Sequence, residues 1–432
     1  MVECNPLKSI VHNPCFALTG SDSFVLKAYM KYAKQHDIIF ISEATVNQVN
    51  QFGGYTGMKP KDYVAMIKQI AEDVDFPLEK IVLSGDHLGP FVWRTNDART
   101  AMEYSKNLVR EYVAAGFRKI HLDPTMPLAD DESFGDEIIA KRICELAEVA
   151  EETYEKTKND TPWTYRPVYV LGSEVPTPGG STKIESMNVT KPEILKQSLN
   201  LFRETLTNNG LEKVWNDTVA VVAQIGLEFS EDNVYNFNYN NAKPLADELG
   251  KDFPQLVFES HSSDYQTADC LVDMVRDRVG ILKVGPEVTF KYREGLYALS
   301  MIEKELAPIY GFIPSNYIDV LDCAMLSAEP NYWIDYYHGT PEEIMLKRKY
   351  SFSDRSRYYS TQKIVVAARE LLLQNLEKVK IPLTIISQYL PEQYQHIREG
   401  KINPDPISIL EDKCNAVIDR YYQNMKKAQK MN

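Results

Sequence analysis

Polar side chains that could bind a metal ion or move protons recur where short apolar segments of this sequence end. The set comprises Glu43, Asp86, His87, Asp123, Glu174, Gln224, Glu228, His261 and Lys283. Imidazole, carboxylate and amide groups suit zinc or a divalent ion such as manganese, and positioned carboxylates can shuttle protons. A single carboxylate in such a place can also cap the next helix, but its recurrence after seven of eight segments favours a shared polar site.

Two histidines stand just past apolar segments, and they are the best metal-ligand candidates: His87 and His261, joined by Glu174 and Gln224. His121 lies inside its segment, and its alternative interpretation is a packed or backbone-bonded histidine. Fewer than four firm ligands would leave a position open for substrate, as a Lewis-acid site requires. The competing interpretation is that these residues form only a buried hydrogen-bond network.

Other members of the set are candidates for acid–base work and for substrate binding. Proton transfer is assigned to Asp86, Asp123 and Glu228, and substrate binding to Glu43, Gln48, Ser262 and Lys283. Two glycine-rich segments, residues 51–57 and 176–180, could form rim loops of the site or simple tight turns. Neither has the glycine spacing of a nucleotide-binding loop, which counts against a nucleotide-dependent kinase.

The apolar segments themselves predict the fold that would bring these side chains together. Eight short runs rich in β-branched residues alternate with longer amphipathic stretches such as 24–34, 60–74 and 98–115. The runs are residues 15–19, 37–42, 80–84, 119–122, 167–171, 218–223, 256–260 and 280–284. This alternation predicts an α/β fold, a (β/α)8 TIM barrel, whose strands converge at their carboxyl ends on one mouth.

The strand rhythm stops near Pro286, and the rest of the chain has helical periodicity. Residues 292–306, 363–376 and 407–430 are expected to be helical, with breaks at Pro308, Pro314, Pro330, Pro382 and Pro391. We therefore expect a barrel over residues 1–299 and a helical C-terminal region over residues 300–432 that packs on the barrel.

Composition limits the class of protein. A net charge of -13 over 432 residues argues against a nucleic-acid partner, which needs a basic footprint. No apolar run approaches the ~20 residues that span a bilayer, and no signal-peptide core follows Met1. The six cysteines are spread singly, which fits reduced thiols. We expect a cytoplasmic protein with no membrane association.

Long motifs also resemble a known family. Residues 42–58 (SEATVNQVNQFGGYTGM), 85–90 (GDHLGP), 119–123 (KIHLD), 172–176 (GSEVP), 259–267 (ESHSSDYQT) and 281–286 (ILKVGP) resemble the accessory, non-catalytic subunit of class II D-tagatose-1,6-bisphosphate aldolase. The tail matches through residues 353–359 (SDRSRYY) and 386–391 (ISQYLP). The resemblance implies a (β/α)8 barrel that supports the activity and stability of a catalytic subunit. Relatives in the superfamily are metal-dependent 4-epimerases of ketohexoses, their phosphates or uronates.

The pair Asp86-His87 further resembles an Asp-His pair on strand three of class II aldolases. There the histidine binds zinc and the aspartate moves the proton, and the resemblance implies these roles for His87 and Asp86. The sequence departs from those aldolases in having Gln224 and Glu228 where they supply a histidine ligand, and in lacking their glycine-rich phosphate loop. Ile225 stands where the family is expected to have proline. Aldolase activity by this chain alone is therefore not expected.

Two functions follow as expectations. The first is an accessory subunit whose partner is a catalytic aldolase subunit or a second copy of the chain. The second is a metal-dependent 4-epimerase that interconverts fructose and tagatose or their 6-phosphates, with zinc or manganese as cofactor and a sugar or sugar phosphate as ligand. A metal that polarises oxygen and carboxylates that move protons would serve either route of epimerisation at C4.

Overall fold

The computed structural model describes residues 4–172 and 188–431 of the chain. These residues form two compact units. The barrel unit runs to Glu228, resumes over Val234–Val284 and includes the chain from Tyr421 onward, whereas the helical unit comprises Phe229–Asn233 and Gly285–Arg420. That a helical region from residue 300 packs on the barrel stays a prediction.

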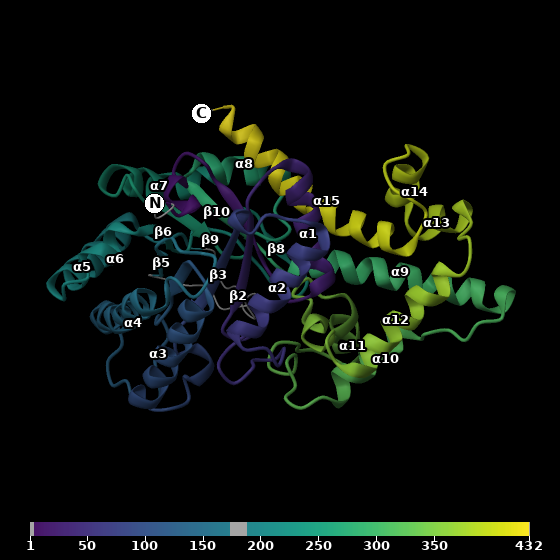
Figure 1. Cartoon of the computed structure of the whole chain (residues 1–432), viewed down its shortest axis with the longest axis horizontal. Helices are drawn as coiled ribbons and strands as arrows, with labels where there is room; N and C mark the ends of the chain where they lie inside the picture. The colour runs from purple at the N-terminus through teal and green to yellow at the C-terminus, as the bar shows by residue number, and fades with distance from the viewer. Residues whose placement is uncertain (1–3, 173–187, 432) are drawn as a thin grey trace. The chain divides into compact units, whose positions relative to one another are not determined.

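A closed barrel of eight parallel strands forms the centre of the barrel unit (Figure 1). Its strands, in chain order, are β1 (Cys15–Thr19), β2 (Phe40–Thr45), β3 (Ile81–Leu88), β4 (Lys119–Leu122), β5 (Val168–Gly172), β6 (Thr218–Val222), β9 (Val257–Ser260) and β10 (Val279–Val284). They neighbour one another in chain order, and β10 closes on β1. The predicted (β/α)8 barrel and its eight strand segments are confirmed.

The barrel strands are buried at every residue except Thr19 of β1, as expected where a parallel sheet is covered on both faces. Every residue of β2 and β3 is buried. Both strands run further than the apolar runs that predicted them, because β2 reaches Thr45 and β3 reaches Leu88. Glu43, Asp86 and His87 consequently belong to the strands rather than to the loops that follow.

Helices connect the strands and carry clear start signals in the sequence. They are α1 (Ser23–His36), α2 (Pro60–Val74), α3 (Ala98–Ala115), α4 (Asp136–Thr157), α5 (Pro192–Asn208), α6 (Glu212–Asn216), α7 (Tyr239–Asp252) and α8 (Ala268–Arg276), with 3-10 turns η1 (Pro6–Ser9), η2 (Leu78–Lys80) and η3 (Phe91–Trp93). Asp22 caps α1 by accepting the backbone N–H groups of Phe24 and Val25. Thr267 caps α8 in the same way through Cys270. Such caps satisfy amide groups that the first helical turn leaves unpaired. A two-residue pair, β7 (Glu228–Phe229) with β8 (Val234–Tyr235), lies outside the barrel.

Among its described residues, the helical unit contains only one strand residue, Phe229 of β7. Its helices are α9 (Pro286–Tyr310), α10 (Tyr317–Ser327), α11 (Pro341–Tyr350), η4 (Arg355–Tyr359), α12 (Lys363–Glu377), α13 (Leu383–Tyr389), α14 (Pro391–Arg398) and most of α15 (Pro406–Gln429). Pro308 does not break its helix as predicted, since α9 continues to Tyr310. It lies in the last turn, where the helix ends shortly afterwards at Gly311.

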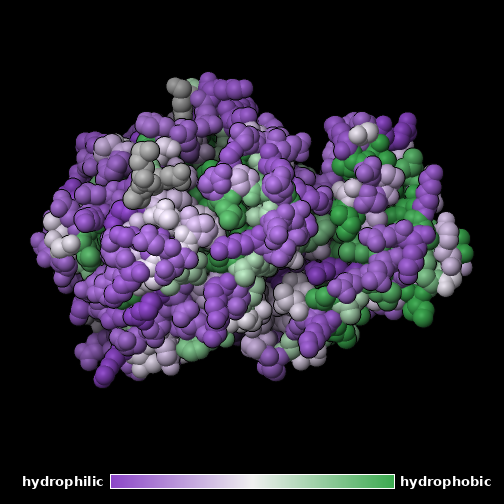
Figure 2. Space-filling view, in the orientation of Figure 1, coloured by the Kyte–Doolittle hydropathy of each residue, from purple (hydrophilic) through white to green (hydrophobic). Residues whose placement is uncertain are grey.

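Large apolar side chains are exposed mainly on the helical unit. They are Met301, Ile309, Tyr310, Ile313, Leu326, Ile334, Met345, Leu346, Tyr350, Ile364, Leu371 and Leu383. In Figure 2, apolar residues gather over the part of the view where Figure 1 labels α9, α10, α12 and α13. Among the described residues, no helix has both the length and the apolar character needed to cross a membrane.

Candidate metal and acid–base site

Asp86 and His87 are consecutive residues of β3, yet both side chains enter the same polar network. Side chains normally alternate between the faces of a strand. Here the pairing of β3 with β4 shifts register between Gly85 and Leu88, and His87 adopts a left-handed conformation with φ 49°. A bulge of this kind re-aims a side chain and is held by its surroundings at a cost of about 1–3 kcal/mol. The local backbone therefore places a histidine beside an aspartate.

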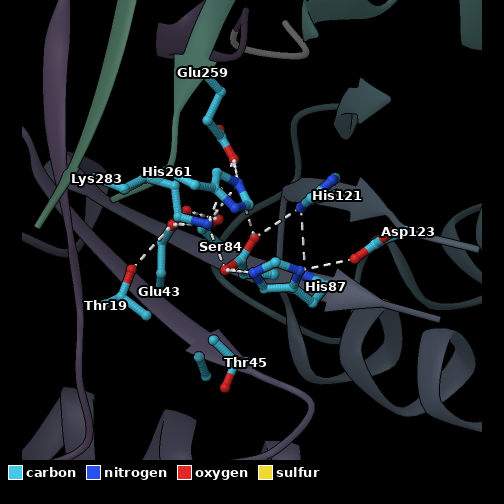
Figure 3. A network of polar contacts seen from close by, with 12 residues as sticks. Thr19, Glu43, Thr45, Ser84, His87, His121, Asp123, Glu259, His261 and Lys283 are labelled. Carbon is cyan, nitrogen blue, oxygen red and sulfur yellow. Dashed lines mark hydrogen bonds and ion pairs between the residues drawn. The ribbon is translucent and has the colours of Figure 1, made fainter. Parts of the chain in front are cut away.

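Four buried side chains form the centre of the site (Figure 3). Asp86, His121, Glu259 and His261 each offer one ligand atom, and these atoms all lie within 4.8 Å of one another. They come from β3, β4, the end of β9 and the residue that follows it. Two imidazoles and two carboxylates are a donor set that zinc and manganese accept.

His121 has a nitrogen that is available to a ligand. Its Nδ1 lies 2.8 Å from Asp86 Oδ1, while its Nε2 is buried without a hydrogen-bond partner among the described residues. A carboxylate on one imidazole nitrogen commonly orients the other nitrogen toward a metal. An unpaired buried nitrogen is otherwise costly. The four clustered donor atoms are therefore the observation that best fits a bound cation.

His87 lies beside this cluster and is fully engaged. Its Nδ1 is 2.8 Å from Asp123 Oδ2, and its Nε2 is 3.4 Å from Asp86 Oδ2. The His87 ring is 4.7 Å from the ring of His261 and 5.4 Å from that of His121, measured between centroids. Gly89 keeps this corner tight, because a Cβ there would lie 1.9 Å from the carbonyl oxygen of Asp123.

Two lysines are buried against the carboxylates. Lys119 Nζ lies 2.7 Å from Glu43 Oε1 and 2.5 Å from Glu259 Oε2. Lys283 pairs with Asp86 and lies 3.0 Å from His261 Nε2. Three carboxylates (Glu43, Asp86, Glu259) therefore face two ammonium groups, and Asp123 pairs with His87 instead. Negative charge is in excess around the lysines, which favours a cation at the cluster.

The electrostatics keep the charged groups charged and the ligand imidazole neutral. Burial alone would raise the pKa of Asp86, but the charges of His87 and Lys283 and the hydrogen bond from His121 hold it well below its usual value. Burial lowers the pKa of Lys283, but the carboxylates of Asp86, Glu43 and Glu259 outweigh it and raise that pKa. Burial and the charge of Lys283 lower the pKa of His261 well below its usual value. A neutral imidazole is the form that binds metal.

The structure brings together most of the residues singled out from the sequence. One polar network contains Asp86, His87, Asp123, His261, Lys283 and Glu43, and Figure 3 labels all of these except Asp86. Glu43 also accepts hydrogen bonds from Ser84 at 3.1 Å and from Thr19 at 3.4 Å. Their assignment as catalytic, substrate-binding or metal residues stays a prediction.

The structure does not show the remaining candidates in this network. Gln224 Oε1 accepts the backbone N–H of Gly226 at 2.8 Å, and Gln48 Oε1 accepts that of Thr45 at 2.9 Å. Glu228 is buried in β7. Ser262 follows the barrel strand β9 with φ 58°. Glu174, like the glycine-rich segment 176–180, lies outside the described residues.

Two central residues, Lys119 and Glu259, were absent from the candidates drawn from the sequence, and His121 was left open. Each carries a signal in the period of its strand. Lys119, His121 and Asp123 alternate along one segment, as do Glu259 and His261 along another. Alternate residues of a strand share a face. A search for polar residues two apart from a strand-end residue would have found His121 and Glu259, and a second step of the same period would have reached Lys119.

Comparison with known proteins agrees with the architecture. A model of the family described as D-tagatose-1,6-bisphosphate aldolase subunit GatZ/KbaZ-like matches residues 8–426. The crystal structure of a probable tagatose 6 phosphate kinase from Sinorhizobium meliloti 1021 is similar at a TM-score of 0.86 and 36% identity, over 95% of this chain and 100% of that one.

Two aldolase structures are more distant. Fructose-bisphosphate aldolase from Campylobacter jejuni matches at a TM-score of 0.44 and 14% identity, over 86% of this chain and 90% of its own. The YdjI aldolase from Escherichia coli K12 matches at 0.41 and 10%, over 87% and 93%. Neither likeness carries an argument about chemistry. The family match and the 36% identical structure show the family: the chain belongs to the D-tagatose-1,6-bisphosphate aldolase subunit GatZ/KbaZ-like family.

Proposed function

We propose that this chain acts as the accessory subunit of a class II D-tagatose-1,6-bisphosphate aldolase in the catabolism of tagatose 6-phosphate and galactitol-type sugars. The observation that carries the proposal is the family match, which spans residues 8–426 and so includes both units. In this role the chain supports the activity and stability of the catalytic subunit.

The apolar surface of the helical unit supports a docking role. Ile313 is 80% exposed, Ile309 72% and Ile364 61%. Monomeric proteins rarely expose contiguous apolar patches above a few hundred Å², and specific interfaces bury about 800 Å² on each partner. Twelve exposed large apolar residues on one unit are of the right order to supply such an area. We assign this surface to the catalytic subunit.

Co-expression with a catalytic subunit of the same aldolase class tests the accessory role. The catalytic subunit should co-purify with the chain and gain thermal stability and specific activity. Ile313→Glu and Ile364→Glu should each lower co-purification, whereas Ile194→Glu on α5 of the barrel unit, 42% exposed, is the matched control. A catalytic subunit with unchanged stability and activity in the presence of the chain would contradict the proposal.

A second function is favoured by the buried cluster, because a pure interaction protein has little use for it. We propose that the barrel also catalyses a metal-dependent 4-epimerisation of a ketohexose or its 6-phosphate. Asp86, His121, Glu259 and His261 would hold zinc or manganese, which would polarise a sugar oxygen. The chain's own contribution is proton transfer: His87, fixed by Asp123, is placed to accept and return a proton beside Asp86.

An assay with fructose 6-phosphate tests this activity directly. Purified protein with manganese or zinc should form tagatose 6-phosphate, and EDTA should abolish the reaction. His261→Ala should remove activity, while His396→Ala, which alters a histidine paired with Asp412 in the helical unit, should retain it. No turnover with either metal, alongside a stabilised aldolase partner, would leave the accessory role alone.

A further inference from the structure

Arg355 of the helical unit is a buried cation without a counter-ion. The residue is 3% exposed. No carboxylate lies within ion-pair distance of it among the residues that the structure describes, and its Nε and Nη2 have no hydrogen-bond partner there. An arginine cannot lose its proton to relieve this situation. Burying an unpaired charge is among the most costly arrangements in a protein.

The two unpaired nitrogens lie on one edge of the guanidinium group. Nε–H and one N–H of Nη2 point the same way and form the fork that binds two oxygens of a carboxylate or phosphate. The same unit contains a filled example. Arg348 uses this edge for Asp322, with Nε to Oδ1 at 2.8 Å and Nη2 to Oδ2 at 3.1 Å.

The rest of Arg355 is held in place, so that the free edge is fixed. Its Nη1 donates to the carbonyl oxygen of Tyr332 at 2.9 Å. Its guanidinium carbon lies 3.0 Å from the ring centroid of Tyr336, a cation–π contact that restrains the group. A fork that is positioned in advance loses little entropy when it binds an anion.

The adjacent carboxylate, Asp354, is engaged elsewhere. Its Oδ1 accepts from Arg293 Nε at 2.8 Å and from Ser356 Oγ at 2.8 Å. Its Oδ2 accepts from Thr289 Oγ1 at 2.7 Å. Asp354 therefore neutralises Arg293 and leaves the charge of Arg355 uncompensated.

The surroundings of Arg355 carry a positive potential. Arg357 Nη2 donates to the hydroxyl of Tyr358 at 3.2 Å, and the guanidinium carbon of Arg355 lies 5.6 Å from the Tyr358 ring centroid. Burial raises the pKa of Tyr358, but the charges of Arg357 and Arg355, together with a polar contact between the Tyr358 hydroxyl and the Arg355 side chain, outweigh it and lower that pKa below its usual value. The charge of Arg357 therefore adds to that of Arg355 near Tyr358.

We propose that the Nε/Nη2 edge of Arg355 binds the oxyanion group, a phosphate or a carboxylate, of a small-molecule ligand. The site goes beyond the accessory and epimerase roles and depends on neither of them. Planar bidentate recognition of oxyanions is the use for which arginine is favoured over lysine.

Binding of inorganic phosphate to the purified full-length chain is the test. Calorimetry at constant ionic strength should show saturable binding, and Arg355→Lys should weaken it roughly tenfold or more because the fork is lost. Arg355→Gln, which removes the charge, should abolish it. Arg348→Lys, which alters a paired arginine of the same unit, should bind phosphate as the unchanged chain does.

Three further ligands separate the sources of the oxyanion. Fructose 6-phosphate, a hexuronate and uncharged fructose are titrated in turn; tighter binding of the first or of the second identifies the phosphate or the carboxylate, and fructose should not compete with inorganic phosphate. Circular dichroism establishes that each variant is folded. The proposal is overturned if the unchanged chain binds neither oxyanion, or if a folded Arg355 variant binds as the unchanged chain does. Whether the unchanged chain binds an oxyanion can be measured even if a variant does not fold.

Discussion

In the barrel unit three buried carboxylates surround two lysines, whereas in the helical unit Arg355 is buried with no carboxylate partner among the described residues. The first arrangement has negative charge in excess and fits a cation. The second has positive charge in excess and fits an anion. In each unit, a neighbouring group that could reduce the excess charge is already paired with another residue. His87 pairs with Asp123 in the barrel unit, and Asp354 pairs with Arg293 in the helical unit.

The difference between the two units suggests how to tell buried charges that stabilise the fold from those that bind a ligand. Lys119 is entirely buried, yet both of its carboxylate partners are present, so that it belongs to the architecture. Arg355 and the Nε2 atom of His121 are buried with partners missing. A ligand is expected at the second kind of group, because folding alone leaves it unsatisfied.

The largest expected effect is on stability and comes from Lys119→Met. The substitution removes the nearer ammonium group from Glu43 and Glu259 and leaves them only Lys283, at 3.6 and 3.7 Å. Breaking a buried ion pair costs about 3–5 kcal/mol. Urea unfolding of the chain should show a loss of free energy of unfolding of that order, or no folded protein. Lys27→Met, which removes an exposed pair with Asp73 2.7 Å away, should change it by less than about 1 kcal/mol. Equal losses of unfolding free energy in the two variants would show that the buried ion pairs of Lys119 do not stabilise the barrel more than an exposed pair does.

The next effect concerns bound metal. His121→Ala should lower zinc or manganese content as strongly as His261→Ala, by about tenfold or more in affinity, because both supply an imidazole to the cluster. His87→Ala distinguishes the ligand set predicted from the sequence from the one that the geometry favours. A loss as large as that of His121→Ala would make His87 a ligand. Metal content measured by atomic emission after dialysis decides, with His396→Ala as the control.

The sequence predicted the barrel more completely than the site, for a physical reason. Burial on both faces leaves a continuous apolar run, which is visible in one dimension, and all eight strands follow from it. The site depends on which polar residues share a face and on a local bulge. Asp86 and His87 both enter the network only because the strand pairing shifts register and His87 adopts a left-handed backbone conformation. Neither feature can be predicted from a histidine in the sequence.

The helical unit was the least predictable part. Its helices follow from the periodicity of the sequence, but the role of Arg355 depends on which charged groups pair with one another in the folded structure. Asp354 stands beside Arg355 in sequence and would be taken as its partner, whereas the fold gives Asp354 to Arg293 and Thr289, which lie more than 60 positions earlier in the chain. An unpaired charge is a property of the packed structure alone.

A smaller effect separates the two arginines. Arg348→Met leaves Asp322 without its bidentate partner and should lower the free energy of unfolding by about 1–3 kcal/mol. Arg355→Met removes a charge that lacks a partner, and in phosphate-free buffer it should cost less than Arg348→Met or stabilise the protein. A greater loss from Arg355→Met, measured by urea unfolding, would show that a group of the chain already compensates Arg355.

The smallest effect comes from Asp277, which shows how a buried charge without a partner behaves when it is able to neutralise itself. Its Oδ2 is buried without a hydrogen-bond partner among the described residues, at the end of α8 in the barrel unit. Burial, with a smaller effect from Asp247 and Asp273, raises the pKa of Asp277 from 3.8 to about 6. Because the folded-state pKa is the higher one, ionised Asp277 destabilises the fold at pH above 6, and this penalty disappears as pH falls toward 3.8.

Asp277→Asn should therefore stabilise the chain at pH 7.5, and the gain should vanish near pH 4. The full shift corresponds to about 3 kcal/mol, and solvent screening near the helix end reduces it to about 1 kcal/mol. Urea unfolding of both proteins at pH 7.5, 6 and 4.5 measures the difference, with Asp269→Asn, at an exposed position of α8, as control. A gain that does not depend on pH would mean that packing, not charge, limits this position. Asp277 can take up a proton, whereas Arg355 cannot release one, and for that reason only the arginine requires a ligand.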